Sequence, residues 1–239
     1  MIFPGLQALP GGFIMQNRIL DWPDCKNVRD LGGLRTRTGG LTHFGGILRA
    51  DTPSRLTAAG WAALYDYGIR TIVSLRTHGM TEPELDVSAP YPDIAIVQVE
   101  IEDVTNRDFV QKWASTDFWS TPLYYPDALQ LWPDRHAAAV SAIGQAKPGG
   151  VLFHCVRGHD RTGIISLLLL ALTGVAPEDI LADYALSLDP ERETLLASRQ
   201  TTTREVLLGT LAQLDAESYL LSGGASRDDL SAVRARLLG

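Results

Sequence analysis

The chain has 239 residues, of which 45% are hydrophobic and 21% are charged, a balance typical of one globular domain with a well-filled core. Its net charge of -7 argues against a general nucleic-acid-binding protein, because such proteins carry basic surfaces that replace counterions along the phosphates. The only two cysteines, Cys25 and Cys155, are too few for a disulfide framework. They favour a cytoplasmic location, and secretion without a signal peptide stays open.

The N-terminal segment carries no recognisable targeting signal. Residues 1–15 are apolar but interrupted by Pro and Gly, and they lack a basic leading stretch and a small-residue cleavage site. We predict a disordered leader over residues 1–18 and a single domain over residues 19–239. The longest apolar run, residues 164–172, is far shorter than the roughly 20 residues that span a membrane, so no membrane span is expected.

Strands and helices alternate through the first half of the predicted domain. The Gly- and Thr-rich stretch of residues 27–57 favours tight turns, with a short strand near residues 46–49. Thr57 can cap a helix, after which the β-branched residues 70–75 indicate a buried strand. A third strand is predicted over residues 94–101.

The second half of the predicted domain is mainly helical. Residues 123–146 have helical periodicity, and a short apolar strand follows at residues 151–154. A Gly-containing loop then leads into a strongly apolar helix over residues 162–172, and residues 177–184 and 190–238 also indicate helices. This order predicts an α/β domain with a central, mostly parallel sheet flanked by helices and a helical C-terminal region.

One loop combines the features of an anion site. Residues 154–163 read His-Cys-Val-Arg-Gly-His-Asp-Arg-Thr-Gly and join the short strand to the apolar helix. Backbone N–H groups in such a turn can form an anion cradle, and the helix adds the positive end of its dipole. Helix N-termini and nearby cations favour an ionised cysteine, so Cys155 is predicted to be a thiolate nucleophile. Arg161 supplies a planar fork that suits two phosphoryl oxygens.

Six loop residues are predicted to bind phosphate. They are Val156, Arg157, Gly158, His159, Asp160 and Arg161. The structural alternative is a buried cysteine in a core strand, but such strands do not normally place so many charged side chains beside the thiol. A zinc site using His154, Cys155 and His159 would need further ligands, and the chain has no second Cys pair at ligand spacing. We therefore expect no metal and no other cofactor.

His-Cys, five further residues and Arg-Thr-Gly resemble the phosphate loop of protein tyrosine phosphatases. Together with Asn-Val-Arg-Asp-Leu-Gly-Gly at residues 27–33, the loop resembles the bacterial tyrosine phosphatases that include mycobacterial protein tyrosine phosphatase B. The resemblance runs from about residue 20 to residue 187 and includes residues 48–51 and 183–187. It implies a tyrosine/dual-specificity phosphatase-like fold and one phosphatase domain over residues 19–239.

The resemblance also implies a two-step reaction without a metal. Cys155 would take the phosphoryl group, an acid would protonate the leaving oxygen, and water would then hydrolyse the phosphocysteine. Thr162 would hydrogen-bond the sulfur, and His154 would orient the loop. Asp160, which matches the loop aspartate of the family, is our first choice for the acid.

Other positions for the acid are weaker candidates. The family often has a second aspartate before the Leu-Arg pair of a strand, but Ser74 stands there in this chain. Two Trp-Pro-Asp triplets, ending at Asp24 and Asp134, spell the mobile acid loop of the larger eukaryotic enzymes. Pro133 fits a helix start, so we interpret Asp134 as structural, and Asp24 likewise.

Two pairs of charged residues lie outside the loop. Arg29 and Asp30 could support the site, or they could form a buried pair that fixes a Gly turn, and the sequence leaves both readings open. Arg76 and Glu82 are predicted to form a structural ion pair.

The resemblance favours phosphotyrosine on a protein as the substrate, extending to phosphoserine, phosphothreonine, phosphoinositides or another small phosphate ester. His159 replaces a lysine that relatives acting on phosphoinositides carry, which predicts weak activity on these lipids that rises as the pH falls toward 6. Two other classes stay open: a binding module that reads phosphate without turnover, and a thiol redox enzyme such as an arsenate reductase with Cys25 as resolving thiol. The sequence does not indicate an oligomeric state.

Overall fold

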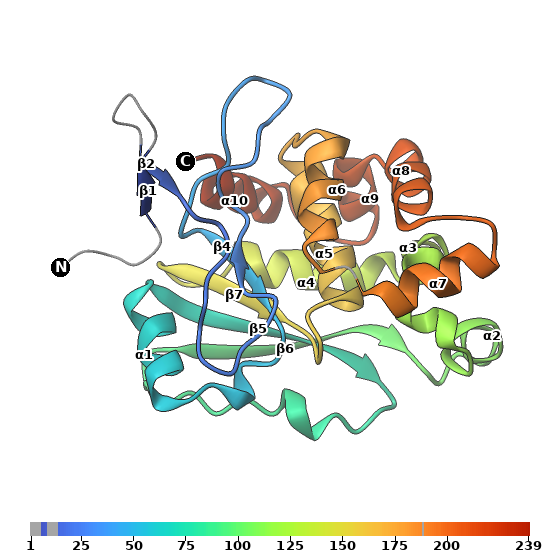
Figure 1. Cartoon of the computed structure of the whole chain (residues 1–239), viewed down its shortest axis with the longest axis horizontal. Helices are drawn as coiled ribbons and strands as arrows, with labels where there is room; N and C mark the ends of the chain where they lie inside the picture. Colours follow the sequence, from blue (N-terminus) through green and yellow to red (C-terminus); the bar gives the residue numbers. More distant parts are fainter. Residues whose placement is uncertain (1–5, 9–13, 188) are drawn as a thin grey trace.

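A computed structural model describes residues 6–8, 14–187 and 189–239 of the chain (Figure 1). Its main sheet has five strands in the order β3-β4-β7-β5-β6. The strands are β3 (Arg29–Asp30), β4 (Ile47–Ala50), β5 (Ile69–His78), β6 (Ala95–Asp103) and β7 (Gly150–His154). Only the β3–β4 pair is antiparallel, so the prediction of a mostly parallel sheet is confirmed.

The central strands are buried on both faces. Every residue of β4 and β7 is buried, so their apolar residues follow one another without alternation, and the buried polar residues Arg49 and His154 stand among them. β6 lies at the edge of the sheet and is correspondingly more exposed. The strands predicted near residues 46–49 and over residues 70–75 and 94–101 are all present with slightly different bounds.

Helices cover both faces of this sheet (Figure 1). They are α1 (Ala58–Asp66), α2 (Arg107–Phe109), α3 (Tyr125–Leu131), α4 (Pro133–Gly144), α5 (Asp160–Leu172), α6 (Pro177–Ala185), α7 (Pro190–Ser198), α8 (Thr203–Gln213), α9 (Ala216–Ser222) and α10 (Arg227–Leu238). Single turns add η1 (Pro53–Arg55), η2 (Pro83–Leu85), η3 (Val110–Ala114), η4 (Asp117–Ser120) and η5 (Pro122–Tyr124). No helix in these residues is long and apolar enough to cross a membrane.

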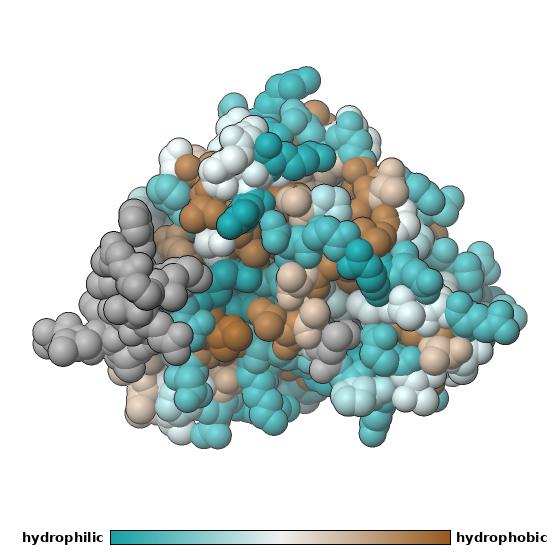
Figure 2. Space-filling view, turned by 45° about the horizontal axis from the view of Figure 1, so that its top comes forward, coloured by the Kyte–Doolittle hydropathy of each residue, from teal (hydrophilic) through white to brown (hydrophobic). Residues whose placement is uncertain are grey.

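Two apolar cores hold the layers together. α1 packs on one face of the sheet, where Trp61 and Leu64 join Ile72 and Leu152 in one cluster. The larger core on the other face surrounds α5, nearly all of whose residues are buried. α5 therefore runs through the interior, which is why its sequence is apolar on every side. On the face drawn in Figure 2, hydrophilic residues predominate and apolar residues form small patches between them.

Side-chain caps and prolines set the helix boundaries. The Thr57 hydroxyl accepts a hydrogen bond from Gly60 N at 3.2 Å, as predicted for the cap of α1. Pro133 begins α4. Residues 190–238 were predicted to be helical, and they form four separate helices, α7 to α10, in which Thr202 and Asp215 cap α8 and α9.

The N-terminal residues include a small antiparallel pair of strands, β1 (Leu6–Ala8) and β2 (Ile14–Gln16). The predicted disordered leader falls largely on residues 1–5 and 9–13, which lie outside the described residues. At the end of that segment, Arg18 forms an ion pair with Asp183.

Candidate active site

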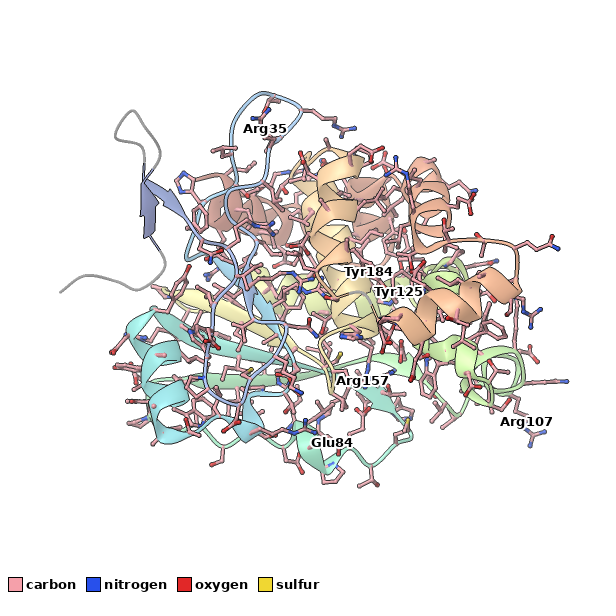
Figure 3. All side chains as sticks on the ribbon, in the orientation of Figure 1. Arg35, Glu84, Arg107, Tyr125, Arg157 and Tyr184 are labelled. Carbon is pink, nitrogen blue, oxygen red and sulfur yellow. The ribbon has the colours of Figure 1, made fainter. Side chains whose placement is uncertain are left out.

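The loop after β7 stands at the carboxyl edge of the parallel strands, next to a cavity. β7 ends at His154 and α5 begins at Asp160, so Cys155 lies at the first position of the connecting loop. Cys155 is only 3% exposed, yet it lines a cavity of about 510 Å³. Arg157, at the turn of this loop, and Glu84, on the segment beneath it, both line the cavity and lie near one another in Figure 3.

Four consecutive carbonyl groups of this loop are tied to the surrounding protein. The Cys155 carbonyl lies 3.2 Å from Nδ1 of His154, whose N–H can donate to it. The next three carbonyls also accept hydrogen bonds: Val156 O from Thr52 N at 3.3 Å, Arg157 O from Asn27 Nδ2 at 2.9 Å, and Gly158 O from Arg49 Nη2 at 2.7 Å. These four contacts fix the orientation of four successive peptide groups.

The fixed carbonyls leave the N–H groups of the same peptides facing the other way. A trans peptide directs its N–H opposite its C=O, and the described residues include no cis bond. Among those residues, no backbone N–H from Val156 to His159 donates to a protein acceptor. Gly158 makes the close turn possible: its φ is +68°, and a Cβ there would lie 2.5 Å from Ala50 O. Unpaired N–H groups on successive residues can form a concave set of donors for an anion.

Arg161 is held at the cavity by two glutamates. Its Nη1 and Nη2 each lie 2.8 Å from a carboxylate oxygen of Glu82, and Nη1 also donates to Leu75 O at 3.0 Å. Burial lowers the pKa of Arg161, but the charges of Cys155, Glu102 and Glu82 outweigh burial and raise the pKa above its ordinary value. The guanidinium therefore stays charged.

The contact between Arg161 and Glu82 corrects one prediction. Glu82 does not pair with Arg76, which instead forms an ion pair with Asp86. Glu102, 3.9 Å from Arg161 Nε, is the second carboxylate at this position. Burial raises the pKa of Glu102, against the charge of Arg161 and the hydrogen bonds from Tyr124 and Thr77. Neither glutamate was predicted as a site residue.

Asp160 lines the cavity and is held by an arginine that the sequence did not reveal. Arg192, on α7, is 4% exposed and forms an ion pair with Asp160 Oδ1. Its guanidinium also donates to His159 Nδ1 at 3.1 Å and to Ser120 O. Burial raises the pKa of Asp160, although Arg192, Arg157 and Arg161 act in the opposite direction.

Both loop histidines are uncharged near neutral pH. Burial lowers the pKa of His154 to about 4, so His154 orients the Cys155 peptide as a neutral imidazole. Burial, with the charges of Arg192 and Arg157, also lowers the pKa of His159 to about 4. The predicted rise in phosphoinositide activity toward pH 6 assumed that His159 becomes charged there, so this assumption is wrong for the free protein.

The Thr162 hydroxyl is buried and unpaired. Thr162 Oγ1 has no hydrogen-bond partner among the described residues, so the hydrogen bond to the Cys155 sulfur that the resemblance implies is not formed in this structure. The hydroxyl lies on the first turn of α5, one residue after Arg161, and remains available for a group that enters the loop.

Arg29 and Asp30 lie outside the cavity lining and do not pair with each other. Arg29 Nε lies 3.1 Å from Asp183. Asp30 accepts hydrogen bonds from Gly32 N at 2.7 Å and Gly45 N at 2.6 Å, so it holds the glycine turn, but without the Arg29–Asp30 pair of the structural reading.

The remaining acid candidates also lie outside the cavity lining. Asp24 and Asp134 are both exposed, and Asp134 belongs to the first turn of α4. Ser74 is buried in β5. The structural interpretation of both Trp-Pro-Asp triplets agrees with these positions.

Cys25 is a poor candidate for a redox partner of Cys155. The two cysteines are free and belong to different apolar clusters, Cys25 to the α1 side and Cys155 to the α5 side. Cys25 Sγ donates to Asp51 Oδ1 at 3.0 Å. Burial and this carboxylate raise the pKa of Cys25 far above its ordinary value, which keeps the thiol protonated and unreactive.

Comparisons with known proteins identify the family of the chain. The sequence model of the tyrosine phosphatase family matches residues 20–239, so the chain belongs to this family. Over 185 residues the chain is 31% identical to a Cupriavidus necator protein whose name assigns it, provisionally, as a tyrosine-protein phosphatase. That match covers 74% of this chain and 66% of the relative.

Two further matches are more distant or shorter. The chain is 27% identical over 199 residues to the triple specificity protein phosphatase PtpB of Mycobacterium tuberculosis, covering 72% of this chain and 70% of that protein. A tyrosine-protein phosphatase of Nostoc commune is 33% identical over 141 residues, with 59% and 48% covered. The solved Siw14 catalytic core matches 86% of this chain and 98% of its own with a TM-score of 0.42 at 15% identity, a likeness that supports no inference about this chain.

Proposed function

We propose that the chain hydrolyses phosphomonoesters through a phosphocysteine on Cys155, with phosphotyrosine as the favoured substrate and without a metal. The observation that carries the proposal is the loop of residues 155–159, whose carbonyls are tied outward and whose N–H groups have no protein acceptor. A phosphate seated on these donors would lie above the sulfur of Cys155. Arg161 borders the same cavity and can engage two phosphoryl oxygens.

In the first step, the Cys155 thiolate attacks phosphorus and the bond to the leaving oxygen breaks. The backbone donors and Arg161 stabilise the charge that builds on the transferring phosphoryl group. Asp160 gives its proton to the leaving oxygen, and the raised pKa of this aspartate favours the protonated form that such a step requires.

In the second step, water attacks the phosphocysteine and Asp160 takes the proton that the water gives up. The sulfur leaves as a thiolate, and the unpaired hydroxyl of Thr162 is available to stabilise it. Glu82 and Arg192 act as positioning residues, because the first holds the fork of Arg161 and the second holds the carboxylate of Asp160.

The two other classes are less well supported. A phosphate-reading module needs the donors of the loop but has no use for a thiol and an acid in one cavity. A redox enzyme of this type needs a resolving thiol, and Cys25 is buried, protonated and part of a different apolar cluster from Cys155. The substrate is therefore proposed to be a phosphorylated protein or a smaller phosphate ester.

The test is phosphate release from phosphotyrosine peptides, phosphoserine peptides and phosphoinositides, with and without a chelator. We expect turnover of phosphotyrosine peptide that the chelator leaves unchanged. Cys155→Ser should abolish turnover while retaining phosphate binding, because the hydroxyl is a far poorer nucleophile and the backbone donors remain. Substantial turnover by Cys155→Ser would disprove the phosphocysteine, whereas loss of activity on chelation would disprove the metal-free reaction.

A further inference from the structure

The cavity that contains Cys155 is acidic away from the phosphate loop. Of the carboxyl groups in its lining, Glu82 and Glu102 contact Arg161 and Asp160 belongs to the loop segment, whereas Glu84 and Asp117 come from η2 and η4. The cations in the same lining are Arg157 and Arg161 alone. A phosphate on the loop would therefore meet backbone donors and arginine beneath it, but carboxylates around the rest of its substrate.

Little positive charge is left for a second phosphate group. The charge of Arg161 is offset by Glu82, with two contacts of 2.8 Å, and by Glu102. His159 is not part of the cavity lining, and its Nδ1 accepts a hydrogen bond from Arg192. Among the described lining residues, this leaves Arg157 as the one cation without an ion pair.

Two of the carboxylates are free to meet a cation on the substrate. Glu84 belongs to η2 and Asp117 to η4, and the carboxylate of neither has a hydrogen bond or ion pair within the described part of the chain. The backbone of Glu84 is fixed, because its carbonyl accepts hydrogen bonds from the hydroxyls of Thr52 and Ser54. The fixed backbone keeps Glu84 in the cavity lining, where Arg157 also lies (Figure 3).

We propose that this cavity selects phosphotyrosine that is flanked by basic residues, and that it disfavours substrates with additional phosphates such as phosphoinositides. The inference rests on the proposed function and deepens it. With the phosphate on the loop, the substrate residues beside the phosphotyrosine would lie next to Glu84 and Asp117. A lysine or arginine there is attracted by these carboxylates, and a glutamate is repelled by them. Like charges brought together in this way reject a substrate as effectively as good contacts select one.

The experiment compares three phosphotyrosine peptides that differ only in carrying Lys, Gln or Glu on both sides of the phosphotyrosine. We expect kcat/KM to fall in that order, with a difference on the order of tenfold between Lys and Glu at low salt. The difference should shrink in about 1 M salt, where the Debye length is only about 3 Å. A soluble phosphoinositide should react more slowly than the Gln peptide.

Charge-removing variants assign the preference to the cavity. Glu84→Gln combined with Asp117→Asn should bring the Lys and Glu peptides within about threefold of each other, because the local field is lost. The matched control is Asp66→Asn combined with Asp228→Asn, which removes two exposed carboxylates on α1 and α10, outside the cavity lining. This control changes the net charge equally and should keep the wild-type ratio.

The outcomes separate this inference from the proposed function. Equal kcat/KM for the three peptides, a preference for Glu, a faster reaction with the phosphoinositide, or a cavity variant that keeps the wild-type ratio would overturn the substrate preference alone. Hydrolysis of neither the peptides nor a small aryl phosphate would overturn the proposed function and the preference with it.

Discussion

Asp183 and Asp160 are both largely buried and both form ion pairs with arginine, but the pKa of Asp183 is lowered and the pKa of Asp160 is raised. Asp183 contacts Arg18, Arg29 at 3.1 Å and Arg49 at 3.4 Å. Burial raises its pKa, but these three charges outweigh burial and leave the pKa below its ordinary value. At Asp183 the charges of the three arginines therefore favour the ionised carboxylate despite its burial.

At Asp160 the balance is reversed. The described residues place one ion-pairing arginine on this carboxylate, and burial dominates, so the pKa is raised. The carboxylate surrounded by three arginines anchors the scaffold of the loop: Arg49 contacts Asp183 and also donates to Gly158 O. The carboxylate with one arginine lines the cavity, where it can carry a proton.

The largest effect is expected from Asp183→Asn. The substitution leaves the buried Arg29 and Arg49 without their counter-charge, and breaking such a buried pair costs about 3–5 kcal/mol. Urea denaturation should show this loss as a lower midpoint. Asp160→Asn should cost clearly less, because the new amide oxygen can still accept the hydrogen bond from Arg192. Equal destabilisation by the two variants would contradict the distinction between scaffold and site.

A second effect should appear in catalysis at Asp160. Asp160→Asn removes the proton donor, so a substrate with a poor leaving group should react about 100-fold more slowly or worse. A substrate with an activated phenol should lose only a few-fold, because a stable phenolate leaves without protonation. Steady-state rates over a series of aryl phosphates of different phenol pKa measure the difference. Equal slowing across the series would move the acid to another residue.

The sequence predicts the parts of this site that are contiguous in the chain. The strand, the loop and the first turn of α5 lie within one short segment, so its cysteine, glycine and arginine have a local pattern that can be recognised. The sheet and the cap of α1 follow from similarly local signals. Arg29 and Asp30 were noticed for the same reason, but their partners were not.

The partners of the site residues have no such pattern. Arg192 meets Asp160 across 32 positions, and Glu82 meets Arg161 across 79 positions. In the sequence, Arg192 belongs to a charged stretch that is indistinguishable from a solvated helix face. Only the packing of α7 against η4 and the loop turns Arg192 inward, and packing between distant segments is not encoded in residue spacing.

Arg192→Met tests whether the arginine positions Asp160 electrostatically. The charge of Arg192 lowers the pKa of Asp160, so its removal should raise that pKa further and move the alkaline limb of the rate profile to higher pH. Because the Asp160 carboxyl would also lose its orientation, substrates with poor leaving groups should react about tenfold more slowly. Arg192→Lys keeps the charge and should restore most of the pH profile. If the role of Arg192 were purely structural, both variants would react more slowly while the alkaline limb of the rate profile stayed at the same pH.

The smallest effect is the opposite pH dependence of the two aspartates in stability. Because the pKa of Asp183 is depressed by folding, its contribution is complete above the unfolded value of about 3.9 and is lost as the pH falls through the folded pKa. Because the pKa of Asp160 is raised, its contribution is complete below about 3.9 and is lost as the pH rises through the folded pKa.

Urea denaturation from about pH 3 to about pH 7 can separate the two contributions, since one pKa unit corresponds to about 1.4 kcal/mol. The stability difference between wild type and Asp160→Asn should decrease as the pH rises. The difference between wild type and Asp183→Asn should instead decrease as the pH falls below about 4. If both differences moved in the same direction, the arginines around Asp183 would not be setting its charge, and burial alone would govern the two carboxylates alike.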